Sequence, residues 1–135
     1  MALLLQRMSE GLSYLRARAG EDHNALRDDD ERLSGLKYRF VTTIEYLVNV
    51  AQHLCAAQGW GPPTDNADAV RVLARHGVLD AELADRLARA VGFRNVLVHQ
   101  YAEVDDDRVV AMLDEVDDIS DFTSVVSDWL LRQRE

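Results

Sequence analysis

Hydrophobic residues recur along most of the chain at spacings of three and four positions, the period of an α-helix with one buried face. No segment alternates apolar and polar residues as a half-exposed strand does. In the first predicted helix, residues 3–19, the apolar face consists of Leu5, Met8, Leu12 and Leu15. Gly20 ends this helix. The polar, acidic residues 21–32 are expected to form a connection.

The longest predicted helix runs from about Asp30 to about Gln58, and Asp28–Asp30 can supply its cap and first-turn carboxylates. Its apolar positions repeat at four, three, four and three residues: Phe40, Ile44, Leu47, Ala51 and Leu54. The sequence GWGPP at positions 59–63 breaks the pattern. A short helix is expected from about Ala67 to His76, ended by Gly77.

Two more helices complete the pattern. Asp80 caps a helix that runs toward Tyr101, and Asp105 or Asp106 caps another whose apolar positions extend from Val109 to Trp129. The prediction is an all-α fold, an antiparallel helical bundle of four longer helices and one short lateral helix. A length of 135 residues, 47% of them hydrophobic, fits a single domain over 1–135.

Composition narrows the classes of function. No apolar run is long enough to span a membrane, and the lone cysteine, Cys55, fits a reducing compartment, so a cytoplasmic location is expected. The net charge of −9 argues against non-specific nucleic-acid binding, which depends on phosphate contacts. An RNA substrate therefore requires a local basic surface, or a partner that builds one.

Arg94 is the first candidate for chemistry because it interrupts an apolar seam. Leu83, Leu87, Ala90, Arg94, Leu97 and Tyr101 follow one another at spacings of three and four. A guanidinium cannot lose its charge, so a buried one needs a carboxylate, a bound anion or a second subunit. The alternative is a structural arginine that reaches solvent or pairs internally.

His99 lies five positions after Arg94, which rotates it about 140° away on an ideal helix. The two side chains can flank one cleft, or meet where the helix pairs with a copy of itself. Asn95 shares the face of His99 and could orient its imidazole or contact a phosphate. A lone helix histidine is otherwise structural or a surface residue.

The segment Arg-Asn-Val-Leu-Val-His-Gln-Tyr at 94–101 resembles the Arg-x-x-x-x-His signature of the HEPN superfamily, and more narrowly the Arg-x-x-x-x-His-x-Tyr motif of HepT-like ribonuclease toxins. The likeness extends to TTIEYLVNVAQHL, the Trp-Gly-Pro-Pro break, GVLDAELADRLARAVGFRN and YAEVDDDRV. It implies metal-independent RNA cleavage without a cofactor, in which Arg94 stabilises the phosphate and His99 transfers protons.

The resemblance also implies partners: a second copy of the chain, and an MNT-type nucleotidyltransferase antitoxin that attaches AMP to Tyr101. A phosphate and a base at Tyr101 would block RNA by charge and bulk. The residue-level alternative is an aromatic side chain that closes the apolar seam.

A polar stripe runs along one face of the longest predicted helix and consists of Glu45, Asn49 and His53 at spacings of four. It could line the cleft and contact Arg94. The resemblance implies an acidic residue where Asn49 stands, and because asparagine lacks that charge, Glu45 could replace it as the partner of Arg94. The alternative is a solvated stripe. His53 and Cys55 point apart on a helix, so no metal site is predicted.

Two functions therefore compete. The first is an endoribonuclease toxin of a type II toxin–antitoxin system, with Arg94 and His99 as catalytic residues and Asn95, Glu45 and Asn49 in support. The second is a non-catalytic HEPN module that binds a nucleotide or a partner. The divergent directions of Arg94 and His99 predict a homodimer with the Asp80-capped helix near its two-fold axis.

Overall fold

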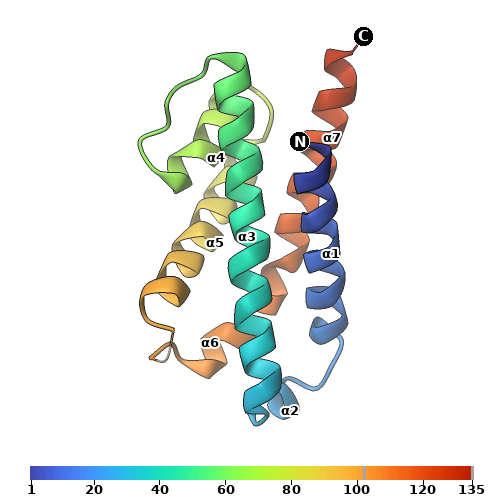
Figure 1. Ribbon diagram of the computed structural model, residues 1–135, viewed down its shortest axis with the longest axis vertical. Helices are drawn as coiled ribbons and strands as arrows, with labels where there is room; N and C mark the ends of the chain where they lie inside the picture. The colour runs from blue at the N-terminus through green and yellow to red at the C-terminus, as the bar shows by residue number, and fades with distance from the viewer. Residues whose placement is uncertain (102, 135) are drawn as a thin grey trace.

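The computed structural model describes residues 1–101 and 103–134, and the predicted all-α fold is confirmed. Four long helices run alternately down and up the molecule, so that the bundle is antiparallel and both termini lie at the same end (Figure 1). They are α1 (Ala2–Ala19), α3 (Asp30–Gln58), α5 (Ala81–His99) and α7 (Val116–Gln133). The central α3 packs against α1 on one side and α5 on the other.

Shorter helices join the long ones. The short lateral helix is α4 (Asn66–Arg75), as predicted to within one residue at each end. The structure adds α2 (His23–Arg27) within the predicted connection. It also divides the last predicted helix into α6 (Asp106–Ala111), a 3₁₀ turn η1 (Met112–Glu115) and α7.

The division of the last helix follows from the spacing of its apolar residues. Buried side chains recur there at every third position: Val110, Leu113, Val116, Ile119 and Phe122. A repeat of three drifts around an α-helix, whereas a 3₁₀ turn has three residues per turn and stacks positions i and i+3. Tightening the chain over η1 therefore keeps these side chains on the core side.

The connection between α1 and α3 was expected to be irregular but contains α2. The carboxylate of Asp22 caps this helix by accepting from the backbone N–H of Asn24 at 2.9 Å, and Leu26 is fully buried. One cap and one apolar anchor form a single helical turn. A helix with a single buried residue has no repeating apolar pattern, so its sequence looks the same as that of a loop.

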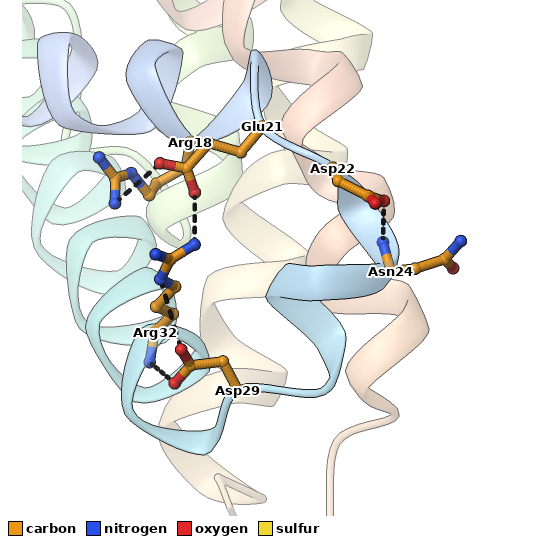
Figure 2. Close-up of polar contacts among 6 residues, drawn as sticks. All are labelled: Arg18, Glu21, Asp22, Asn24, Asp29 and Arg32. Carbon is orange, nitrogen blue, oxygen red and sulfur yellow. Dashed lines mark hydrogen bonds and ion pairs between the residues drawn. The ribbon is translucent and has the colours of Figure 1, made fainter.

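Ion pairs fix the entry into α3, as Figure 2 shows. Glu21 forms ion pairs with Arg18 at 3.1 Å and with Arg32 at 3.3 Å, which tie the end of α1 to the first turn of α3. Asp29 caps α3 by accepting from the backbone N–H of Arg32 at 3.1 Å and also pairs with its side chain. Asp29 is therefore the residue of the Asp28–Asp30 run that caps α3, as the sequence predicted for this run.

The break between α3 and α4 is anchored by aromatic contacts. Gly59 ends α3 with φ 72°, a left-handed conformation that glycine adopts without strain. Trp60 then stacks on His76 at a ring-centroid distance of 4.2 Å and meets Trp129 edge-on at 5.9 Å. These contacts hold the GWGPP segment against the end of α4 and against α7.

Candidate active site

Arg94 projects from α5 toward α3, and its side chain is 19% exposed. Its neighbours on the predicted seam, Leu87, Ala90 and Leu97, are buried. Its Nη2 lies 3.8 Å from Oε2 of Glu45, and its Nη1 donates to Oδ1 of Asn95 at 3.0 Å. Of the partners considered for this arginine, the structure provides a carboxylate, and that carboxylate belongs to Glu45.

The guanidinium of Arg94 is incompletely paired. Its Nε is buried and has no hydrogen-bond partner within the described part of the chain, and a buried donor left unsatisfied costs about 1–3 kcal/mol. The ion pair with Glu45 is long, and the Glu45 side chain is 51% exposed, so the pair adds little stability. Arg94 is thus held in place, and N–H groups on its Nη atoms remain available to an anion.

Asn95 contacts Arg94, whereas no hydrogen bond joins Asn49 to Arg94 among the described residues. The amide oxygen of Asn95 accepts from Arg94, whereas no hydrogen bond joins Asn95 to His99 among the described residues. Asn49 is exposed one turn beyond Glu45 on α3. The carboxylate beside Arg94 belongs to Glu45 and not to position 49.

His99 is the last residue of α5 and is exposed. Five residues on a helix separate His99 from Arg94 by about 7.5 Å along the axis and about 140° around it. The structure therefore keeps the two groups on one helix but on different faces.

Tyr101 lies beyond the end of α5, next to the first third of α3. Its side chain is 44% exposed, and its hydroxyl donates to the carbonyl oxygen of Ser34 at 3.5 Å. The expectation that Tyr101 continues the seam on the Arg94 side of the helix is wrong, because α5 ends at His99. Ser34 and Glu45 are eleven positions apart, so Tyr101 and Arg94 meet α3 at levels separated by about 16 Å.

Lys37 secures Tyr101 and was missed in the sequence. Its ammonium donates to the carbonyl oxygen of Tyr101 at 3.3 Å, lies 5.0 Å from the centre of the tyrosine ring, and pairs with Asp106 at 3.6 Å. Lys37 is buried between Leu33 and Phe40, at spacings of four and three on the apolar side of α3. That is the signal that identified Arg94: a cation where a core residue is expected.

The structure also bears on metal binding and on membrane insertion. Within residues 1–101 and 103–134, no group of three or more His, Cys, Asp or Glu side chains is placed to hold a metal ion. No helix in the same part of the chain is long and apolar enough to cross a membrane.

The helical bundle and the motif on α5 define a HEPN-type protein. The model of the family described as ribonuclease HepT-like matches residues 8–126, so the chain belongs to that family and the resemblance seen in the motif is confirmed. A putative RNase of Archaeoglobus fulgidus is 36% identical over 84 residues, and the mRNA nuclease HepT of Shewanella oneidensis is 31% identical over 83 residues. These alignments span 62% and 61% of this chain, and 63% and 62% of the relatives.

Solved structures share the fold. The tri-AMPylated HEPN toxin of Shewanella oneidensis, in complex with MNT antitoxin, superposes with a TM-score of 0.85 over 94% of this chain and 96% of that one, at 22% identity. A cytosolic protein of unknown function from Bacillus subtilis, YutE, superposes with a TM-score of 0.75 over 95% and 91% of the two chains, at 16% identity. At such identities the likeness shows the fold alone.

Proposed function

We propose that this chain is a metal-independent endoribonuclease toxin of a type II toxin–antitoxin system, acting as a single HEPN/HepT-like domain over 1–135. The observation that carries the proposal is the state of Arg94: a mostly buried guanidinium with a loose carboxylate partner and an unsatisfied Nε, five positions from an exposed histidine. The names of the relatives, putative RNase and mRNA nuclease, support a ribonuclease.

The chemistry uses two groups. A neutral His99 takes the proton of an RNA 2′-hydroxyl and the 2′-oxygen attacks the adjacent phosphorus. The bond to the 5′-oxygen breaks, and that oxygen takes a proton from water. The products are a 2′,3′-cyclic phosphate and a 5′-hydroxyl end. Arg94 donates to the phosphate oxygens as negative charge accumulates on them. Asn95 and Glu45 orient the guanidinium, and Asn49 lies where the RNA would pass.

We also propose a homodimer that brings the motifs of two subunits to one interface, with the His99 side of each α5 at the contact and each Arg94 on the opposite, α3 side of its own helix. The outer face of α5 suits such a contact. Gly92, Val96 and His99 follow one another there at spacings of four and three, and a Cβ added at Gly92 would have no atom of this chain within 4 Å. Glycine inside an exposed helix is unfavourable without a second reason, such as close approach of a partner.

We further propose that an MNT-type nucleotidyltransferase antitoxin neutralises this toxin by attaching AMP to Tyr101. The Shewanella oneidensis neighbour is AMPylated and bound to MNT antitoxin, and the tyrosine here is 44% exposed. An added phosphate two residues from His99 would repel the RNA backbone. The encounter is expected in the cytoplasm, where Cys55 stays reduced.

The experiment that tests the nuclease is cleavage of single-stranded RNA by purified protein in excess EDTA, followed by analysis of the product ends. Arg94→Ala and His99→Ala should each lower the rate on the order of 10²- to 10⁴-fold, and Asn95→Ala should lower it less. Arg71→Ala on α4 and His23→Ala on α2 are matched controls at exposed positions. Cleavage that survives in His99→Ala would refute the assignment.

The second candidate is a non-catalytic HEPN module that binds a nucleotide or a partner. The net charge of −9 favours it, because an acidic surface repels RNA. The same experiment separates the two functions: a module leaves RNA intact at every protein concentration, yet still binds the nucleotidyltransferase in a pull-down with purified components.

A further inference from the structure

Several arginines have no carboxylate partner among the described residues, and two of them lie on one side of the bundle. Most basic side chains pair with a carboxylate, as Arg16 does with Asp117 and Arg86 with Asp118. Within residues 1–101 and 103–134, no carboxylate lies within 4.0 Å of the side-chain nitrogens of Arg7 on α1 or Arg39 on α3. Their charges are therefore uncompensated on an otherwise acidic protein.

Both arginines line one hollow of about 160 Å³ between α1 and α3, named here the α1–α3 pocket. Its other polar walls include Glu10, Tyr38 and Tyr46. One carboxylate against two guanidiniums leaves the pocket with a net positive charge. A concave, cationic, polar site of this size fits one phosphate group better than an apolar ligand.

Tyrosines rather than acids hold the two arginines, one through its hydroxyl and one through its ring. Nη1 of Arg7 donates to the hydroxyl of Tyr46 at 3.5 Å, and the guanidinium of Arg39 lies 5.1 Å from the centre of the Tyr14 ring. Such contacts fix a guanidinium without neutralising it. Tyr38, at the pocket wall, is 62% exposed and offers a free ring to a planar partner.

The α1–α3 pocket adjoins the candidate active site across one helix. Tyr38, Thr42, Glu45 and Asn49 follow one another on α3 at spacings of four, three and four and form its solvent-facing stripe. Arg94 reaches Glu45 from the α5 side, while Arg7 lies on the α1 side, and α3 runs between these two helices (Figure 1). The width of a helix with its side chains, about 10–12 Å, separates the two cationic points.

We propose that the α1–α3 pocket is a second RNA subsite, which binds a nucleotide flanking the one cleaved at Arg94 and His99. This inference rests on the proposed ribonuclease function. Arg7 and Arg39 bind a backbone phosphate, and Tyr38 stacks on the adjoining base, a pairing that tolerates any sequence. The subsite supplies the local positive surface that a chain of net charge −9 requires.

The test measures binding separately from cleavage. A fluorescently labelled, fully 2′-O-methylated single-stranded RNA cannot be cut by 2′-oxygen attack, so its anisotropy reports affinity alone. The double variant Arg7→Gln/Arg39→Gln should weaken binding at least tenfold and lower the slope of log Kd against log salt by about 0.7, as expected for one lost phosphate contact to a single strand. In cleavage assays, it should raise KM and leave kcat nearly unchanged.

Matched variants separate local from general effects. Arg132→Gln/Arg134→Gln at the end of α7 removes the same two charges from exposed arginines and should change affinity less than threefold. Tyr38→Ala should weaken binding about five- to 150-fold through lost stacking, and Tyr38→Phe, which keeps the ring, should bind like the parent. Far-UV circular dichroism establishes that each variant is folded.

Three results would overturn the subsite: equal losses in the two double variants, no measurable binding of the RNA to the parent, or a loss confined to complex formation with the nucleotidyltransferase. The last would make the pocket a protein interface. Failure of the proposed function is distinguishable: binding that depends on Arg7, Arg39 and Tyr38 without any cleavage of unmodified RNA would retain the subsite and remove the nuclease.

Discussion

Substitution of Gly92 by alanine separates the stability of the subunit from the stability of the proposed dimer. Gly92 is exposed in the middle of α5, and an added Cβ meets no atom of its own chain within 4 Å. Within one subunit the methyl group therefore encounters no steric obstacle. Alanine is favoured over glycine inside a helix by about 0.8–1 kcal/mol, so the midpoint of thermal unfolding should rise by roughly 3–5 °C for a domain of this size.

The proposed dimer should respond in the opposite direction. If the outer face of α5 lies at the two-fold axis, each subunit adds one methyl group to the same packed contact. Overpacking costs about 1–3 kcal/mol per site, so two sites raise the dimer dissociation constant by at least tenfold. Cleavage should fall in parallel at low protein concentration and recover at high concentration, because the catalytic groups themselves are unchanged.

Analytical ultracentrifugation over a dilution series measures the dimer, and circular dichroism at a dilution where both proteins are monomeric measures subunit stability. Gly20→Ala is the control, since Gly20 has an ordinary right-handed conformation at the end of α1 and room for a Cβ. A Gly92→Ala protein that dimerises as tightly as the parent would refute the placement of α5 at the axis. A clean, fully active parent monomer would refute the dimer itself.

Three more outcomes are expected. Tyr101→Phe should fold normally, since the hydroxyl makes only a 3.5 Å contact with Ser34, and should gain no AMP mass with the nucleotidyltransferase and ATP; an equal mass gain in parent and variant would place the modification elsewhere. Lys37→Met keeps the buried stem but loses the contacts to Tyr101 and Asp106, so hydrogen exchange at the amides of Glu103 and Val104 should accelerate; unchanged protection would contradict a positioning role for Lys37. A hydrogen bond with Asp118, together with burial, raises the pKa of Glu115, so the folded state holds that proton more tightly than the unfolded state, and stability falls as pH rises from the ordinary carboxyl range through the raised pKa. Glu115→Gln should therefore unfold at a higher temperature than the parent at neutral pH and lose that advantage in acid; a difference independent of pH would exclude this origin.

The parts of the fold that were predictable are those specified by local chemistry. The ends of α3 are encoded by an aspartate cap at Asp29 and by Gly59, and both signals act within a few residues. The α2 turn was missed because one buried residue, Leu26, provides no periodicity. The break at η1 was missed because a three-residue repeat also fits part of an α-helix, and only packing against the core decides between them.

The candidate site was predictable in its members and less so in its geometry. A charged residue on an apolar seam identified Arg94, but which partner it takes depends on how α3 and α5 pack together. The same rule applied to α3 would have identified Lys37. The position of Tyr101 depended on where α5 ends, and helix ends are weakly encoded when no glycine or proline marks them.

The stacking of Trp60 on His76 and against Trp129 has a spectroscopic consequence. The chain contains two tryptophans, and both belong to this cluster at the α4 end of the bundle, whereas Tyr101 lies past the opposite end of α5. Intrinsic tryptophan emission is therefore a local probe of one pole of the molecule. AMP attached at Tyr101 should leave the emission unchanged, and a shift on modification would mean that α5 transmits the event along its length.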